Sequence, residues 1–365
     1  MTTLFIHIGA PKTGTTAIQD FLLRNREHLR RHGVLYPMAG LFKSAHHTIG
    51  AAVFPGRSHR LVGVSRDEAL RSSVANVRSE IEQSKPHTVI LSSEYLWGRL
   101  SREDVRSLLE PFSDCTIKII AYLRRQDLLA QSLYVQAVKG GLADAFPVWL
   151  ERVADGERAG FDFHRVLSCW TTSGIPAEIV VRVYEKAQLK QDICTDFLGT
   201  VCPQGIAVPQ VSAHVANPGP DQATVELLRL VSRGISDPEI GTRVRKQILA
   251  NSPARPLFAP LNYLTPPEAA AFVARFAESN AKVARDFLGR ANGSLFEEPS
   301  PVAAGTHPAG PSTDAILERL TRLLPILLGD TTSKKPMEQS SAKATARRRK
   351  SDPSSAPMRL DIEAL

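Results

Sequence analysis

Cysteine is scarce in this chain of 365 residues. The four cysteines, Cys115, Cys169, Cys194 and Cys202, show no CxxC spacing and no clustering with histidine. Zinc sites need closely spaced Cys and His ligands, and small disulfide-stapled folds need many more cysteines, so the sequence disfavours both classes. We expect buried, reduced thiols in a cytoplasmic protein that holds no metal.

Long apolar runs are also missing, and no stretch approaches the roughly 18 residues that a membrane-spanning helix needs. The first residues, MTTLFIHIG, carry neither a basic segment nor a small-residue cleavage site, so we expect no secretory signal. Hydrophobic residues still make up 43% of the chain, which is enough to bury a substantial core. The composition therefore indicates a globular protein without a transmembrane segment.

The positive charge is unevenly distributed along the chain. From Thr331 to Leu365, eight basic residues stand against four acidic ones, so this segment carries half of the net charge of +8. The rest of the chain is mildly basic, which suits a protein that binds a compact anion better than one that coats nucleic acid.

The basic tail, residues 331–365, is polar and rich in Ser, Ala and Pro, so we expect it to be disordered. Its run Arg347–Lys350 is of the kind that attracts an anionic surface. A solvated tail without a specific partner is the simpler alternative.

Short apolar segments alternate with amphipathic ones in the N-terminal part of the chain. The pattern predicts strands at Leu4–His7, Val34–Tyr36, Thr88–Leu91, Ile117–Leu123 and Ile179–Tyr184, with helices at residues 15–32, 65–83 and 126–139 and a short one from residue 101. Strands that alternate with helices indicate an α/β fold with a parallel sheet flanked by helices. Such sheets bind ligands at the carboxyl ends of their strands.

Beyond Ala187 the pattern is mainly helical, and we expect one folded domain to span residues 1–297. Pro267–Leu288 contains no internal breaker and predicts one long helix. Residues 298–330 are predicted to be a linker followed by one helix, Thr313–Leu324, which Pro325 is expected to stop. The basic tail then follows.

The loop after the first strand reads Gly-Ala-Pro-Lys-Thr-Gly-Thr-Thr from Gly9 to Thr16. Its two glycines have the spacing of a Walker A loop, but Thr15 stands where the Walker lysine belongs and Lys12 lies inside the loop. A glycine-containing turn that enters a helix presents backbone N–H groups to a phosphate. The sequence therefore predicts a sheet like that of the P-loop NTPases with one phosphate-binding loop.

The expected features of a magnesium-dependent kinase are missing from the strand ends. A Walker B strand ends in Asp, whereas two candidate strands here end in Ser92-Ser93-Glu94 and in Arg124-Arg125. Two arginines would repel a metal ion. These differences favour a metal-free reaction at a single 5′-phosphate.

The strand, the loop and the helix together resemble the 5′-phosphosulfate loop of sulfotransferases that use 3′-phosphoadenosine 5′-phosphosulfate (PAPS). The segment HIGAPKTGTTAIQ is similar to the bacterial branch that modifies carbohydrates. The resemblance extends over about residues 1–297 and implies a fold, a co-substrate and a product, adenosine 3′,5′-bisphosphate (PAP). It implies that the 5′-phosphosulfate is bound by Pro11, Lys12, Thr13, Gly14, Thr15 and Thr16.

The same resemblance implies a second phosphate site. Sulfotransferases carry an Arg at the end of a central strand and a Ser eight residues later, and these two residues bind the 3′-phosphate. Arg124 and Ser132 have that spacing here, and Arg offers a planar fork of donors to a phosphate. Arg125 is the alternative, but it faces the opposite way if the strand alternates.

Sulfuryl transfer needs a cation for the leaving group and a base for the acceptor. Lys12 is the candidate cation, because negative charge develops on the 5′-phosphate oxygen. Glu94, after the third strand, and His47 are the two candidate bases. The acceptor stays open between a sugar or glycan, a peptide and a small alcohol. A P-loop kinase with a deviant Walker A loop and a non-catalytic nucleotide-binding module are the alternative functions.

Overall fold

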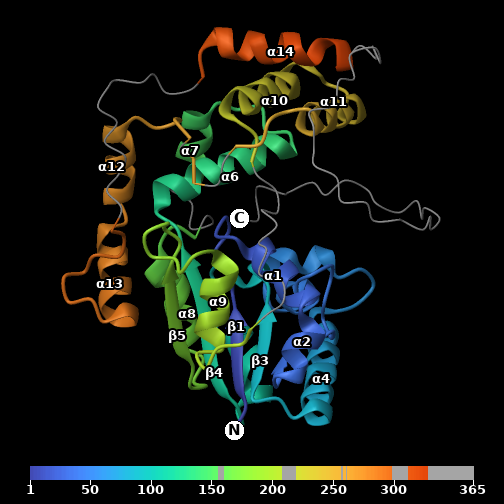
Figure 1. Ribbon diagram of the computed structural model, residues 1–365, viewed down its shortest axis with the longest axis vertical. Coiled ribbons are helices and arrows are strands. Elements are labelled where there is room, and N and C mark those ends of the chain that lie inside the picture. Colours follow the sequence, from blue (N-terminus) through green and yellow to red (C-terminus); the bar gives the residue numbers. More distant parts are fainter. Residues whose placement is uncertain (155–159, 208–218, 256–257, 260, 298–310, 328–365) are drawn as a thin grey trace.

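The computed structural model describes residues 1–154, 160–207, 219–255, 258–259, 261–297 and 311–327 (Figure 1). The basic tail at residues 331–365 lies outside these residues, as does most of the expected linker. In the part of the chain that the structure describes, no helix is both long and apolar enough to cross a membrane. All four cysteines are free, and Cys169 is half-buried rather than buried as expected.

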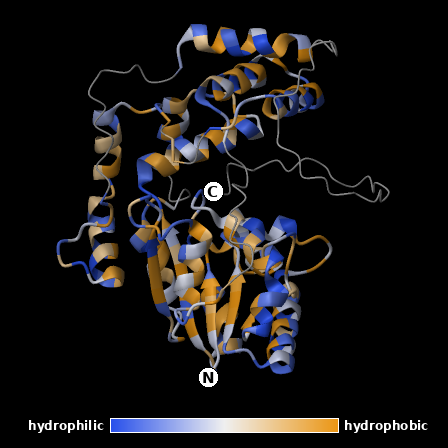
Figure 2. Ribbon diagram, in the orientation of Figure 1, coloured by the Kyte–Doolittle hydropathy of each residue, from blue (hydrophilic) through white to orange (hydrophobic). Residues whose placement is uncertain are grey.

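Five parallel strands form one sheet in the order β2-β3-β1-β4-β5, which confirms the predicted α/β class. Their bounds are β1 (Thr3–His7), β2 (Val34–Leu35), β3 (Thr88–Ser92), β4 (Thr116–Leu123) and β5 (Glu178–Val183). Each lies within a residue or two of a predicted strand. Figure 2 shows that the strands are mainly hydrophobic, as is typical of a parallel sheet covered on both faces.

Helices cover both faces of the sheet. Alternate strand residues point to opposite faces, so Phe5 and Ile90 pack with one set of helices, whereas Leu4 and Ile119 pack with the other. The first set is α1 (Thr15–Arg24), α2 (Arg26–Arg31) and α9 (Ile193–Val201). The second includes α4 (Arg66–Ser84), α5 (Arg102–Leu109), α6 (Gln126–Gly140) and α8 (Phe163–Thr171).

A second group of helices lies beyond the carboxyl ends of the strands (Figure 1). It contains α7 (Phe146–Ala154), α10 (Gln222–Gly234), α11 (Pro238–Ala250) and α14 (Thr313–Leu327), with α6 leading into it from the sheet. Helices α12 (Pro266–Ala274) and α13 (Ala277–Leu288) run along one side, and α13 contacts α8 and β5. Shorter elements are α3 (His47–Val53) and the 3-10 helices η1 (Pro55–Arg60), η2 (Glu94–Leu96) and η3 (Glu110–Phe112).

Three of the predicted helices differ from the structure, two because they are interrupted and one because it ends later than expected. The helix expected at residues 15–32 is divided at Asn25, whose side-chain amide donates to the carbonyl of Phe21 and so competes with the helical hydrogen bonds. The long helix expected at Pro267–Leu288 is divided near Phe276, whose ring packs on Phe161 and Phe272.

The third wrong boundary is the end of α14, which continues to Leu327 with Pro325 inside the helix. A proline removes one helical hydrogen bond, which is why the sequence predicts that the helix stops there. Here the buried Leu323 and the half-buried Ile326 continue the apolar face that packs on the core. Tertiary packing thus outweighs the local cost of the proline.

The buried carboxylate of Asp196 ties α9 to the sheet. It accepts hydrogen bonds from the Tyr122 hydroxyl at 2.7 Å, from Nε of Arg182 at 3.0 Å and from the N–H of Lys190 at 3.1 Å. Burial alone raises the pKa of this carboxyl, but the hydrogen bonds from Arg182 and Tyr122 outweigh it and hold the pKa below its ordinary value. The stabilisation is therefore present near neutral pH and is lost as the pH falls through the lowered pKa.

We predict that Asp196→Ala lowers the free energy of unfolding by about 3 kcal/mol, because it leaves Arg182 and Tyr122 without their partner. Urea unfolding at pH 7 measures the loss. The exposed Asp67, in the first turn of α4, is the control, and Asp67→Ala should cost less than about 1 kcal/mol. Equal losses for the two variants would show that the network adds nothing to stability.

Candidate phosphate-binding and catalytic site

The β1–α1 loop, residues 8–14, lies at the carboxyl end of the central strand. Its backbone is left-handed at Gly9 (φ 50°), Lys12 (φ 64°) and Gly14 (φ 82°). A Cβ at Gly9 would lie 2.6 Å from Cγ2 of Thr15, so the loop can approach the helix this closely only with glycine there. The hydroxyl of Thr13 donates to the carbonyl of Ala10 at 2.6 Å and closes the turn. The loop therefore leads directly into the N-terminus of α1, where the first backbone N–H groups have no partner within the helix.

Lys12 is half-buried in this loop, in a backbone conformation that non-glycine residues rarely adopt. Among the described residues, no carboxylate forms an ion pair with its amine. Burial, together with the charges of Lys139 and Arg124, lowers the pKa of Lys12 to about 8, and the carboxylate of Glu94 opposes this change. A partly desolvated cation of this kind is suited to bind an anion.

Arg124 follows β4 and contacts the same loop. Its Nη1 donates to the carbonyl of Lys12 at 3.2 Å, and its guanidinium lies 5.9 Å from the centre of the Tyr184 ring. Burial lowers the pKa of Arg124 to about 10, which leaves it charged at neutral pH. No acidic side chain in the described ranges pairs with it, so most of its donors are available to a ligand.

Ser132 lies on α6, eight residues after Arg124. Only 7% of the residue is exposed, and its hydroxyl has no hydrogen-bond partner within the described structure. Buried hydroxyls are normally paired, so an unpaired one is a candidate ligand contact. Ser132 stands one helical turn after Leu128, which lines a cavity of about 50 Å³ together with Arg124 and Tyr184.

Sequence reasoning missed two cations near these residues. Arg255 also lines the small cavity, and its buried Nε has no partner among the described atoms. Arg255 belongs to a loop far along the chain. Its backbone N–H donates to the carbonyl of Gly219 at 2.7 Å, and this hydrogen bond holds the loop in place. Lys139, in the last turn of α6, lies close enough to lower the pKa of Lys12. No local motif marks either residue.

Glu94 lies just after β3. Its carboxylate accepts a hydrogen bond from the Thr15 hydroxyl at 3.1 Å, which places it against the start of α1. Its charge also raises the pKa of both Lys12 and His47 against the effect of burial, so the three predicted catalytic residues lie in one electrostatic neighbourhood.

The His47 ring is fixed by two contacts. Nδ1 lies 3.1 Å from the hydroxyl oxygen of Ser93, and the ring stacks on Tyr95 with the centres 4.1 Å apart. Burial lowers the pKa of His47 from its ordinary value, so the ring is neutral at pH 7 and able to accept a proton. The neighbouring His46 uses both nitrogens, accepting from the N–H of Ser92 and contacting the carbonyl of Pro37, and is part of the core.

The remaining predicted residues differ in their exposure. Pro11 is half-buried and Thr16 is exposed on the first turn of α1. Arg125, the alternative to Arg124, is 4% exposed and forms an ion pair with Asp127 at 2.7 Å. Its charge is already neutralised inside the protein, whereas that of Arg124 is not.

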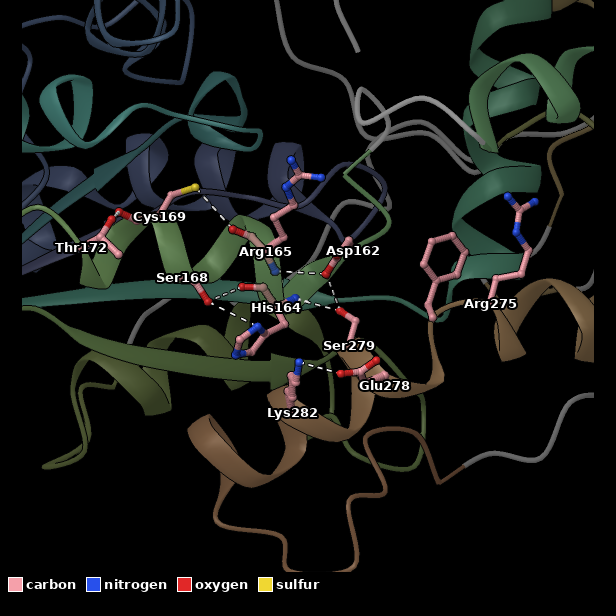
Figure 3. A pocket seen from close by; sticks show the side chains of 11 residues that line it. Asp162, His164, Arg165, Ser168, Cys169, Thr172, Arg275, Glu278, Ser279 and Lys282 are labelled. Atoms are coloured by element: carbon pink, nitrogen blue, oxygen red, sulfur yellow. Dashed lines mark hydrogen bonds and ion pairs between the residues drawn. The ribbon is translucent and has the colours of Figure 1, made fainter.

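A larger cavity lies away from these residues, between α8 and α13. It has a volume of about 730 Å³, and polar side chains line it, including Asp162, His164, Ser168 and Lys282 (Figure 3). The Ser168 hydroxyl lies 3.4 Å from Nδ1 of His164, as a nucleophile would, but it donates to the His164 carbonyl at 2.7 Å. Because the backbone holds its proton, Ser168 is not an activated nucleophile.

Comparisons with known proteins do not identify a family. No family model matches the chain, and no solved structure matches it. An uncharacterized protein of Archaeoglobus fulgidus is 28% identical over 185 residues, which cover 50% of this chain and 48% of that protein. The chain thus spans about half the length of the curated relative that it matches.

We predict that Glu94→Gln lowers the pKa of Lys12 below about 8, because removing the nearby negative charge disfavours the ammonium form. Nuclear magnetic resonance of reductively ¹³C-methylated lysines follows this titration. Glu103→Gln, which removes an exposed charge from α5, should leave the pKa unchanged. An unchanged pKa in Glu94→Gln would mean that the carboxylate does not act on Lys12.

Proposed function

We propose that the chain is a cytoplasmic sulfotransferase that moves a sulfuryl group from PAPS to a hydroxyl or amine of an acceptor, with a carbohydrate or glycan as the preferred acceptor class. The observation that carries the proposal is the pair Arg124 and Ser132. One is a half-buried guanidinium without a carboxylate partner, and the other a buried hydroxyl without any partner among the described residues. Arg124 follows β4 and Ser132 lies on α6, beside a sheet that we propose to be like that of the P-loop NTPases.

In the proposed complex, the two sets of donors would bind the two anionic ends of PAPS. The loop from Pro11 to Thr16 would hold the 5′-phosphosulfate through the backbone N–H groups of Lys12 to Thr16, because Pro11 has no N–H and serves only to shape the turn. Arg124 and Ser132 would hold the 3′-phosphate, with Arg255 as a further donor. Two phosphate sites at a fixed separation distinguish this nucleotide from AMP, which has one phosphate.

In the reaction that we propose, a bond forms between sulfur and the acceptor oxygen while the bond from sulfur to the 5′-phosphate oxygen breaks. The electron pair of the broken bond stays on the phosphate, where Lys12 stabilises it. The acceptor proton goes to a base, for which we propose Glu94. His47, stacked on Tyr95, would assist by orienting the acceptor or by taking the proton from it.

One contact favours a second candidate function. The Thr15 hydroxyl and the Glu94 carboxylate are 3.1 Å apart, and a hydroxyl with a carboxylate is a donor set that can hold Mg²⁺ beside a phosphate. A kinase that uses ATP with magnesium would exploit this pair. Such an enzyme would have no use for the unpaired Ser132 hydroxyl.

We predict that calorimetry finds PAP bound more tightly than AMP or ATP with magnesium. Arg124→Ala should weaken PAP binding about 30-fold and Ser132→Ala about 10-fold, because each removes hydrogen bonds to a charged phosphate. The affinity for AMP should stay unchanged in both variants, since AMP has no 3′-phosphate.

The exposed Arg71 on α4 provides a matched control, and Arg71→Ala should bind all three nucleotides normally. Tighter binding of ATP with magnesium would overturn the sulfotransferase proposal and favour the kinase. An equal loss of AMP and PAP affinity in Arg124→Ala would mean that Arg124 acts by holding the loop at Lys12.

We also predict that Glu94→Gln lowers kcat by at least about 100-fold, as the loss of a general base should, with PAP affinity changed only a few-fold. His47→Gln should lower kcat by about 10-fold. PAP release from PAPS with a panel of saccharide acceptors measures both. The reverse order of effects would assign the base to His47.

A further inference from the structure

A cluster of basic side chains, Lys43, Arg57 and Arg60, lies next to the two candidate bases. The 3-10 helix η1 packs beside α3, and its Arg57 lies over the Tyr95 ring at 5.1 Å from the ring centre. Tyr95 in turn stacks on His47 and directly follows Glu94. The basic cluster is therefore in contact with the elements that carry both candidate bases.

Arg60, at the end of η1, has a side-chain nitrogen whose hydrogen-bonding capacity is unused among the described residues. Its Nε is buried, and in the described part of the chain this atom has no hydrogen-bond partner and no acidic side chain forms an ion pair with Arg60. Arg60 and Arg57 both belong to η1, which packs beside α3, the helix that begins at His47, and the charges of Arg57, Lys43 and Arg60 each lower the pKa of His47. A buried guanidinium N–H without a hydrogen-bond partner costs folding free energy, unless a ligand accepts a hydrogen bond from it.

Glu94 is the carboxylate that opposes these cations at His47, and its side chain already accepts a hydrogen bond from Thr15. Even without Arg57, the two positive charges of Lys43 and Arg60 act on His47 against the one negative charge of Glu94. Neutral acceptors would leave that charge unbalanced, whereas a planar or tetrahedral anion matches the fork of a guanidinium.

We propose that the acceptor carries an anionic substituent near the hydroxyl that is sulfated, and that Arg60 binds this substituent. The proposal rests on the sulfotransferase function and narrows its acceptor to carboxylated or sulfated saccharides. Arg57, packed against Tyr95, contributes charge. A uronate carboxylate and a sulfate ester share the chemistry that Arg60 recognises, and the experiment separates them.

Calorimetry on the full chain saturated with PAP tests the proposal with three tetrasaccharides. Unsulfated chondroitin tetrasaccharide carries carboxylates, sulfated maltotetraose carries sulfate esters, and maltotetraose is neutral. At least one anionic tetrasaccharide should bind about tenfold more tightly than maltotetraose, because a hydrogen bond to a charged group is gained. Arg60→Gln should abolish that preference, and Arg60→Lys should keep part of it.

Arg71→Gln removes an equal charge from the exposed face of α4 and should leave the preference intact. Normal PAP affinity in each variant shows that the protein is folded and that the nucleotide site is present. The proposal is overturned if maltotetraose binds as tightly as both anions, or if Arg60→Gln and Arg71→Gln behave alike. Failure of the unsubstituted chain to bind PAP would instead overturn the sulfotransferase function on which the proposal rests.

Discussion

The position of β1 between β3 and β4 is the constraint on which the whole site depends. In the parallel register, His7 pairs with Ser92 on one side and with Ile120 on the other. The three strands therefore end at the same edge of the sheet, with the β1–α1 loop between the other two chain segments. Glu94 then contacts Thr15, and Arg124 contacts the Lys12 carbonyl. The strand order thus brings Glu94 and Arg124, which are far from the β1–α1 loop in the sequence, into contact with that loop.

This constraint also determines how much could be predicted from the sequence. Buried parallel strands are continuous apolar runs, so their positions, the loop and the spacing of Arg124 and Ser132 are all visible locally. The roles of Arg255 and Arg60 could not be predicted in this way. Each residue belongs to a segment whose position in the fold depends on packing against residues that are distant in the sequence. The predictions of an unbroken helix through Asn25 and of a helix end before Pro325 are wrong for a related reason, since side-chain competition and tertiary packing decide these boundaries.

The choice between Glu94 and His47 shows what geometry adds to a sequence pattern. Each residue alone is an ordinary Glu after a strand or an ordinary His in a loop. In the structure the carboxylate acts on both Lys12 and His47 and raises the pKa of each against the effect of burial. A substitution that removes the Glu94 carboxylate therefore changes the pKa of both Lys12 and His47. Kinetic effects at Glu94 and His47 are therefore not expected to add independently.

The side chains that we propose to bind anions fall into two groups, and this grouping bears on the proposed mechanism. Arg124 and Arg255 line one small cavity, and Ser132 stands one helical turn after Leu128, which also lines it. Arg60 belongs to η1, which packs beside α3. Lys12 and Glu94 belong to the electrostatic neighbourhood that links the two groups. In-line transfer needs the leaving and attacking oxygens on opposite sides of the sulfur. In the proposed complex one group binds the nucleotide and the other binds the acceptor, so binding itself would fix both reactants relative to Lys12 and Glu94.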